Sequence, residues 1–228
     1  MRTVQGHVIK DFKFHHPASI MISGSTGTGK THMTENLINK NMFSKKIKNI
    51  FYYGAQGNCT LEWDQELPHD VQIRLLEGLP STKDLLTLPK RSLVIIDDQF
   101  SEAIESEVVA RAFKVDRRNQ RFSLILITHN VFEKGKHANT IRNNTEVFIL
   151  FKNYGDREQN KRLAKQLGLK RRYEMCLKDF NRTPDDKHSY CILNAQLNCE
   201  DDDLRCITGI FGEFSNIKPA FYPICYTD

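Results

Sequence analysis

Strand-like runs, rich in apolar residues, alternate with helix-like segments along most of the chain. The runs fall at residues 19–23, 49–53, 71–76, 93–96, 123–128 and 146–151. Helix-like sequence follows at residues 31–41, at a short segment that Ser81 opens with Asp84 three residues on, and at about 101–115, where an apolar stripe recurs at Ile104, Val108, Ala112 and Val115. This alternation predicts an α/β fold with a doubly wound, mostly parallel sheet flanked by helices.

The last third of the chain has a different pattern. Asp156 with Gln159 predicts a capping box that opens a helix, and Gly168 predicts where that helix ends. From about Tyr173 we expect a small antiparallel element, with strands near residues 188–194 and 204–211 and an acidic turn at 200–203 between them. The sequence therefore predicts a core over residues 1–172 and a C-terminal extension over 173–228 that packs on it.

The first aliphatic run leads directly into a glycine-rich turn. The turn completes the pattern G-x-x-x-x-G-K-[ST] with Gly24-Ser25-Thr26-Gly27-Thr28-Gly29-Lys30-Thr31. In such a loop backbone N–H groups converge on phosphates, Lys30 brings a charge to the β- and γ-oxygens, and the Thr31 hydroxyl ligates Mg²⁺. Since a strand precedes the loop and helix-like sequence follows it, we expect this chain to bind a nucleoside triphosphate, ATP.

Two carboxylates follow the aliphatic run at residues 93–96. Ligands of open α/β sheets bind at the carboxyl ends of the strands, which is where Asp97 and Asp98 are expected. We expect Asp97 to hold Mg²⁺ opposite Thr31, and Asp98 to orient an attacking water or take its proton. The alternative is that both acids cap a turn before the next helix.

The run at residues 123–128 also ends in polar side chains. Thr128, His129 or Asn130 would reach the γ-phosphate or the water if the strand lies beside the phosphate loop. The alternative is that they are turn residues whose side chains form hydrogen bonds with their own backbone. The sequence leaves open which of the three faces inward.

Composition and charge narrow the classes further. With 228 residues, of which 39% are hydrophobic, the chain suits one α/β domain, and its aliphatic runs are far shorter than the roughly 20 residues that a bilayer span needs. No apolar signal region opens the sequence, so we expect an intracellular protein without membrane association, whose six cysteines are reduced thiols. The net charge of +5 is uneven, with basic clusters near residues 45–48, 117–121 and 161–172 that permit contact with a polyanion.

A zinc site is a further candidate near the end of the chain. His188, Cys191, Cys199 and Cys206 are four ligand types within a short stretch. Their spacings match no common zinc finger and include no C-x-x-C pair, so we interpret the cysteines as ordinary thiols.

These residues resemble the viral genome-packaging ATPases of the FtsK/HerA type, in the branch of the poxvirus packaging ATPases and of adintovirus and Maverick/Polinton-like elements. The resemblance covers most of the chain and is carried by His16-Pro17, the glycine-rich loop, and residues 76–80, 95–98, 127–130 and 144–153. It implies a P-loop NTPase of the ASCE type that assembles into a homo-oligomeric ring. It also implies that ATP hydrolysis moves double-stranded viral DNA into a capsid in the infected cell, with capsid or portal proteins as partners.

The resemblance also assigns roles by position. Lys30 and Thr31 would serve the phosphates and metal, Asp97 the metal, Asp98 catalysis, and Arg118 would act as a finger on the neighbouring subunit's nucleotide. Two positions depart from the family: His129 stands where Gln is usual, and Asp98 where many relatives have Glu. A neutral imidazole can still donate to a phosphate oxygen or position a water, in a pH-sensitive way.

Two other functions remain open from the sequence. One is a nucleotide-gated DNA-binding or partition ATPase, which shares the loop but need not respond to DNA. The other is a nucleoside or nucleotide kinase, which would need a phosphoacceptor pocket and an arginine-rich lid.

Overall fold

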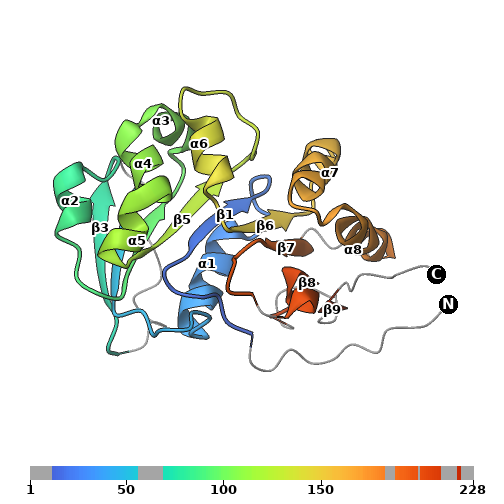
Figure 1. Cartoon of the computed structure of the whole chain (residues 1–228), viewed down its shortest axis with the longest axis horizontal. Helices are drawn as coiled ribbons and strands as arrows, with labels where there is room; N and C mark the ends of the chain where they lie inside the picture. The colour runs from blue at the N-terminus through green and yellow to red at the C-terminus, as the bar shows by residue number, and fades with distance from the viewer. Residues whose placement is uncertain (1–11, 56–68, 183–187, 200, 212–219, 222–228) are drawn as a thin grey trace.

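A single mixed sheet organises the chain. The computed structural model describes residues 12–55, 69–182, 188–199, 201–211 and 220–221. The strands follow the order β3-β2-β4-β5-β1-β6-β7-β8-β9, with the first six parallel and the last three antiparallel (Figure 1). They are β1 (Ser19–Ser23), β2 (Asn49–Gly54), β3 (Gln72–Glu77), β4 (Ser92–Ile96), β5 (Ser123–Thr128), β6 (Val147–Phe151), β7 (Tyr190–Asn194), β8 (Cys206–Thr208) and β9 (Ala220–Phe221).

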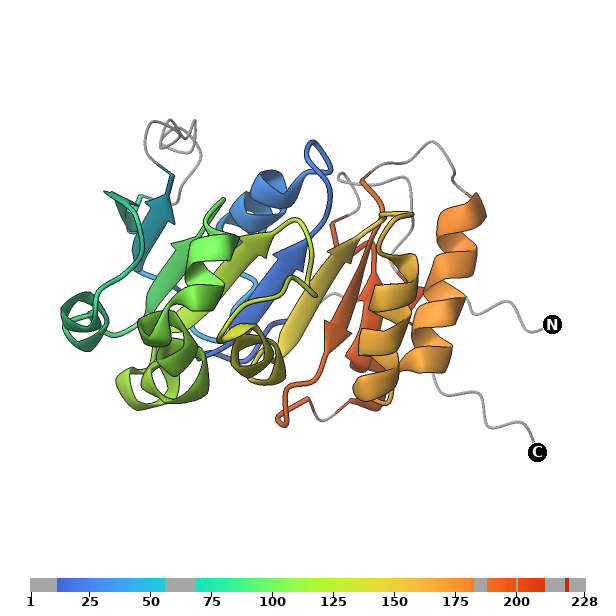
Figure 2. The same cartoon turned by 90° about the horizontal axis from the view of Figure 1, so that it is seen from above.

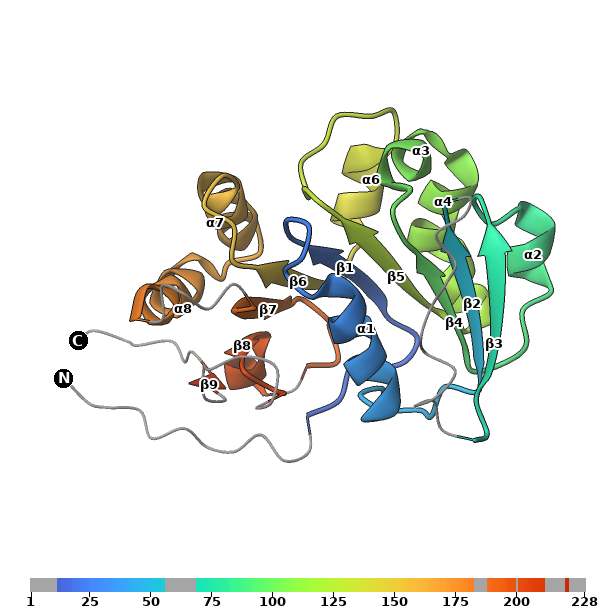
Figure 3. The same ribbon diagram turned by 180° about the vertical axis from the view of Figure 1, so that it is seen from behind.

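Helices cover both faces of this sheet (Figures 2 and 3). α1 packs on one face, against residues such as Ile20 and Ile22, and α2 to α8 pack on the other, against residues such as Met21. Because successive side chains of a strand point to opposite faces, a strand covered on both sides reads as a continuous aliphatic run. The helices are α1 (Lys30–Asn39), α2 (Thr82–Leu86), α3 (Phe100–Glu105), α4 (Glu107–Arg111), α5 (Arg117–Gln120), α6 (Ala138–Asn143), α7 (Arg157–Gln166) and α8 (Lys170–Arg182).

The α/β fold with a mostly parallel sheet, helices on its faces and an antiparallel C-terminal part is confirmed. The capping box of α2 is also present, since Ser81 Oγ accepts from the Asp84 N–H while Asp84 accepts from the Ser81 N–H. In the described part of the chain, no helix is both long enough and apolar enough to cross a bilayer.

The single helix expected at 101–115 is wrong. Ser106 has extended backbone, and its hydroxyl accepts from the Val109 N–H, so that α3 ends and α4 begins there. A π-helical segment, Ala112–Asp116, then adds a residue to the turn and shifts the phase of the stripe. Ile104 and Ala112 are buried as expected, but Val115 is 39% exposed.

The C-terminal third also differs from expectation. Asp156 is the N-cap of α7, but its side chain does not cap the helix, because its carboxylate accepts from the amides of Asn130 and Asn153; the predicted capping box with Gln159 is therefore wrong. α7 ends just before Gly168, which has φ of +72°, as expected.

The predicted extension is continuous with the core sheet. β7 and β8 are antiparallel as expected, but β7 pairs directly with β6, so that both belong to the main sheet. The expected boundary between residues 172 and 173 falls inside α8, a helix that the sequence analysis did not predict. α8 buries Tyr173, Cys176, Leu177 and Phe180, a helical spacing that could have revealed it.

A buried arginine ties the amino ends of three neighbouring strands together. The Arg117 side chain is 1% exposed, and its guanidinium donates to Glu146 Oε1 at 2.6 Å, to the Pro17 carbonyl at 3.3 Å and to the Phe113 carbonyl at 3.3 Å. Pro17 precedes β1, Arg117 precedes β5 and Glu146 precedes β6. A buried charge with several acceptors is costly to leave half-paired, so this cluster makes these strand starts interdependent.

We expect Arg117→Met to lower the free energy of unfolding by about 3 kcal/mol, since it leaves Glu146 without its buried partner. The matched change Arg118→Met removes a 60% exposed guanidinium that donates to the same carboxylate and should cost less than about 1 kcal/mol. Urea denaturation of both variants measures the difference. Equal losses would show that the buried contacts of Arg117 do not carry the effect.

Candidate functional site

The glycine-rich loop joins β1 to α1 at the carboxyl edge of the sheet. The Thr28 hydroxyl donates to the Ser25 carbonyl at 2.8 Å and closes the turn. At Gly29 the backbone is left-handed, with φ of +97°, and α1 has no side-chain cap there. The amides of the first helical turn therefore face the inside of the loop, the geometry that binds anions.

Gly24 is required by close packing. A Cβ built on it would lie 2.6 Å from Phe151 Cβ and 2.8 Å from the Thr28 hydroxyl. Phe151 ends β6, the strand next to β1, so the loop is held against its neighbour by the absence of a side chain.

The Lys30 ammonium lies inside the curl of this loop. Its Nζ atom donates to the carbonyl oxygens of Gly24 at 2.8 Å and Ser25 at 3.2 Å. Burial lowers the pKa of Lys30, and the carboxylates of Asp97 and Asp98 act in the opposite direction. The charge is thus held where a phosphate oxygen would approach, with both predicted acids close enough to influence it.

Asp97 is a half-buried carboxylate that accepts a hydrogen bond from a tyrosine. The Tyr52 hydroxyl, from the neighbouring strand β2, donates to Asp97 Oδ2. Burial raises the pKa of Asp97 above its usual value, whereas the Tyr52 hydrogen bond and Lys30 lower it. An oxygen held this way, together with the Thr31 hydroxyl at the start of α1, suits Mg²⁺, which takes one or two protein oxygens and completes its shell with phosphates and water.

Asp98 and His129 face each other at the ends of adjacent strands. The His129 Nε2 atom lies 3.5 Å from Asp98 Oδ1, and the two side chains are 57% and 55% exposed. Asp98 has φ of +56°, a left-handed conformation that turns its carboxylate away from the path of β4. An exposed carboxylate and imidazole beside the Lys30 loop can orient and deprotonate a water molecule.

The other two polar residues after β5 make contacts within their own turn and with α7. The Thr128 hydroxyl donates to the Asn130 carbonyl and accepts from the Asn130 N–H. The Asn130 amide donates to Asp156 at 3.2 Å and accepts from the Phe132 N–H at 2.7 Å. Of the three candidates, the structure brings His129 close to Asp98, and the catalytic roles of His129 and Asn130 stay predictions.

The predicted finger, Arg118, lies at the other end of β5. Its guanidinium donates to Glu146 at 3.2 Å, and α5 precedes β5, whereas His129 follows it. Six residues of strand separate the two ends by about 20 Å, so Arg118 does not join the site of its own chain. Three other arginines could be considered for the same role: Arg117 is buried and paired, Arg142 lies over the Phe132 ring, and Arg121 is exposed.

The four residues considered for zinc are not gathered. His188 Nδ1 lies 2.9 Å from the Thr28 carbonyl, on the phosphate loop, and Cys199 donates to the Asp201 carbonyl. The buried sulfurs of Cys191 and Cys206 lie 3.6 Å apart, and burial raises the pKa of the Cys191 thiol. Over the described ranges, no group of three or more His, Cys, Asp or Glu side chains is arranged to hold a metal ion.

Comparison with known proteins adds evidence on the fold. No protein-family model matches the sequence, and no curated protein matches it. Among solved structures, the genome packaging NTPase B204 from Sulfolobus turreted icosahedral virus 2 in complex with AMP is similar, with 11% identity and a TM-score of 0.50 over 79% of this chain and 93% of that chain.

Two further structures are similar at lower scores. The same NTPase in complex with sulfate has 12% identity and a TM-score of 0.48, over 79% of this chain and 92% of that chain. The N-terminal domain of zonular occludens toxin from Neisseria meningitidis has 10% identity and a TM-score of 0.37, over 92% and 95% of the two chains. At 11% identity, the similarity to the AMP complex shows the fold alone: this chain shares the fold of that NTPase.

Sequence reasoning missed two contributors to the site. One is Tyr52, whose contact with Asp97 joins strands that are 45 residues apart in sequence. The other is the amide–carboxylate chain Asn130–Asp156–Asn153, which connects the end of β5 to the start of α7. Asp156 was noted only as a helix cap, and nothing local indicates its long-range partner.

We expect Tyr52→Phe to weaken Mg²⁺-dependent nucleotide binding, because losing the hydroxyl raises the pKa of Asp97 further and lets a proton compete with the metal. A hydrogen bond to a charged group is worth about 1.5 kcal/mol, so the half-saturating Mg²⁺ concentration should rise about tenfold. The carboxylate is lost as pH falls through its raised pKa, so the defect should be larger at acidic than at alkaline pH.

Titration of a fluorescent ATP analogue against Mg²⁺ at several pH values measures this. Tyr53→Phe is the matched control, because the buried Tyr53 hydroxyl has no hydrogen-bond partner in the part of the chain that the structure describes. Identical Mg²⁺ curves for the two variants would contradict the role of Tyr52.

Proposed function

We propose that this chain is an ATPase subunit that hydrolyses ATP with Mg²⁺ and uses the energy to move double-stranded viral DNA into a capsid. The observation that carries the hydrolytic part is the meeting, at one edge of the sheet, of the Lys30 loop, the Tyr52-bound Asp97 and the exposed Asp98–His129 pair. An acid–imidazole pair open to solvent suits water as the acceptor of the phosphoryl group.

In this mechanism each side chain has a distinct task. Lys30 and the loop amides neutralise the phosphate oxygens, and Mg²⁺ held by Thr31 and Asp97 adds charge neutralisation when bound. Asp98 takes a proton from the attacking water, and His129 positions that water from the side of β5.

The packaging part is supported by the resemblance of the sequence to viral packaging ATPases. A solved structure of similar fold is named a genome packaging NTPase. Exposed lysines such as Lys45 and Lys48 supply positive charge for a sequence-independent DNA contact. The proposal includes a homo-oligomeric ring of the FtsK/HerA type in the infected cell, with capsid or portal proteins as further partners.

The ring accounts for the position of Arg118. The residue is exposed at the amino edge, far from its own site, so only a neighbouring subunit can present it to a nucleotide. A guanidinium that reaches a γ-phosphate in this way stabilises charge in the transition state.

We expect ATP hydrolysis by the wild-type chain to rise several-fold when duplex DNA of any sequence is added, and this stimulation to fade as salt rises. Lys30→Ala should fall below about 1% of wild-type turnover, since the phosphates lose their cation. Lys90 is an exposed lysine just before the start of β4, so Lys90→Ala is the control and should hydrolyse ATP normally.

Phosphate release, measured with and without DNA and beside phosphoryl transfer to nucleosides, separates the alternatives. Turnover that DNA leaves unchanged would favour a nucleotide-gated partition protein. Transfer to a nucleoside would favour a kinase.

We expect Arg118→Ala to bind ATP normally but hydrolyse it on the order of 10³-fold more slowly. Mixing it with Lys30→Ala should restore activity in part, because about a quarter of the interfaces in randomly mixed rings would pair an intact loop with an intact arginine. The control mixture, Lys30→Ala with Asp98→Asn, damages the same half of the interface twice and should stay inactive. Mixed rings without rescue would remove Arg118 from this role and leave Arg121 as the exposed candidate.

A further inference from the structure

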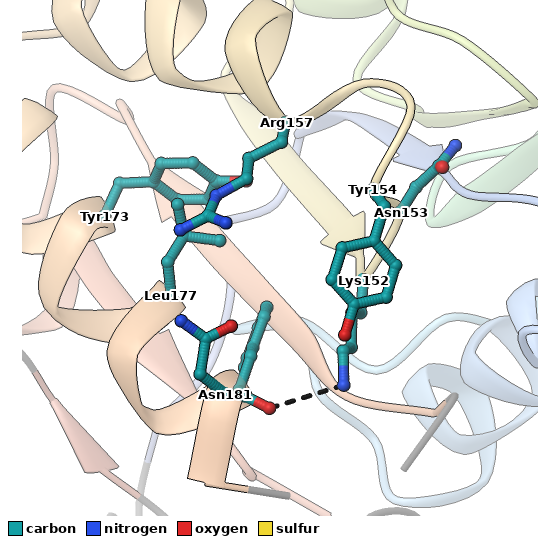
Figure 4. Close-up of a pocket in the computed structure, with 8 residues that line it drawn as sticks. Lys152, Asn153, Tyr154, Arg157, Tyr173, Leu177 and Asn181 are labelled. Atoms are coloured by element: carbon teal, nitrogen blue, oxygen red, sulfur yellow. Dashed lines mark hydrogen bonds between the residues drawn. The ribbon is translucent and has the colours of Figure 1, made fainter. Parts of the chain in front are cut away.

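A hollow opens between the end of β6, the start of α7 and the second half of α8 (Figure 4). It holds about 310 Å³ of space not filled by protein atoms, part of it open to solvent. Figure 4 shows Arg157 beside Tyr173 on one side, with Tyr154 and Lys152 on the other. The Lys152 ammonium donates to the Phe180 carbonyl at 3.3 Å, which joins the turn after β6 to α8.

This hollow lies next to the phosphate loop. Phe151, which packs against Gly24, is followed directly by Lys152 in the wall of the hollow. The Lys152 backbone N–H donates to the Ser189 carbonyl at 2.8 Å. His188, the residue before Ser189, has its Nδ1 atom 2.9 Å from the Thr28 carbonyl. Two short connections therefore run from the loop to the hollow.

The direction of a bound nucleotide follows from the strand order. Asp97, Asp98 and His129 end β4 and β5, which lie on one side of β1. If the γ-phosphate is directed to these residues, the nucleoside must leave the loop on the other side of β1, toward β6 and β7. The hollow is on that side.

The lining has the chemistry of a site for a flat heterocycle. Tyr154 is 66% exposed and offers a ring face, while Tyr173, Leu177 and Phe180 are buried and apolar. The Arg157 Nε atom is buried and has no hydrogen-bond partner among the residues that the structure describes. No acidic side chain is present among the described residues that line the hollow.

We propose that this hollow binds the purine base of the nucleotide whose phosphates lie on the Lys30 loop. Tyr154 stacks on the base, the apolar side chains of α8 exclude water from its other side, and Arg157 donates to a ring nitrogen, an acceptor that every purine carries. The inference rests on the proposed function, because it needs the triphosphate to occupy the loop.

The test compares two ligands on the full chain, ATP and inorganic tripolyphosphate, by calorimetry in Mg²⁺. Wild-type protein should bind ATP more tightly than tripolyphosphate. Tyr154→Ala should weaken ATP binding about tenfold, the scale of one lost base–aromatic stack, and leave tripolyphosphate binding unchanged. Arg157→Gln should have the same selective effect, with Arg162→Gln, an exposed arginine of the same helix, as its unaffected control.

The outcomes separate the two proposals. Binding of neither ligand by the wild-type chain would overturn the phosphate site and the base site together. Binding of both ligands with equal affinity, or an equal loss of both in Tyr154→Ala, would overturn the base site alone.

Photolabelling with 8-azido-ATP gives a second readout without a substitution: label on residues 152–157 or 173–181 supports the proposal, and label elsewhere contradicts it. If duplex DNA protects these residues from the label while leaving bound ATP in place, the hollow is a DNA contact and the proposal is wrong.

Discussion

The pairing of β1 on both of its sides is the constraint on which the functional edge depends. Ser23, the last residue of β1, is aligned with Thr128 of β5 and with Leu150 of β6. The three chain segments that follow are therefore fixed side by side: the phosphate loop, the turn that carries His129, and the turn that carries Lys152. The packing of Phe151 against the bare Cα of Gly24 locks one of these contacts.

Electrostatics at that edge depends on the same burial. Withdrawing Lys30 and Asp97 from water disfavours the charged form of each, and each partly restores the charge of the other. The hydrogen bond from the Tyr52 hydroxyl lowers the pKa of Asp97 and so favours the carboxylate form that a metal would bind. Asp98 and His129, by contrast, remain in contact with solvent, where a water molecule has access.

The parts of this fold that could be predicted from sequence are those whose signal is local. Strands that are buried on both faces appear in the sequence as apolar runs. The phosphate loop directly follows one such run and Asp97 and Asp98 directly follow another, so these features could be predicted. β3 has no buried residue and was still recognisable from its boundaries. The helix break at Ser106 depends on a single hydroxyl, and the π-helical turn depends on one extra residue. Neither is visible in the apolar periodicity, which is a pattern over many residues.

Contacts between distant segments were beyond local reasoning. Tyr52 with Asp97, Asn130 with Asp156 and His188 with Thr28 each join segments that only the folded sheet brings together. α8 is a different case, since its apolar spacing was present in the sequence but was hidden by the charged residues around it. The sequence therefore indicated which chemistry the edge holds, and the fold determined which side chains support it.

The left-handed backbone of Asp98 limits how this site can vary. Asp, Asn and Gly adopt such a φ most readily, whereas longer side chains pay a steric cost of about 1 kcal/mol. A Glu at this position would gain reach toward a water but would strain the turn, and its carboxylate would extend into the space that the His129 imidazole occupies. The short side chain of Asp98 therefore suits the ring of His129 opposite it. We expect positions 98 and 129 to change together among proteins that share this site.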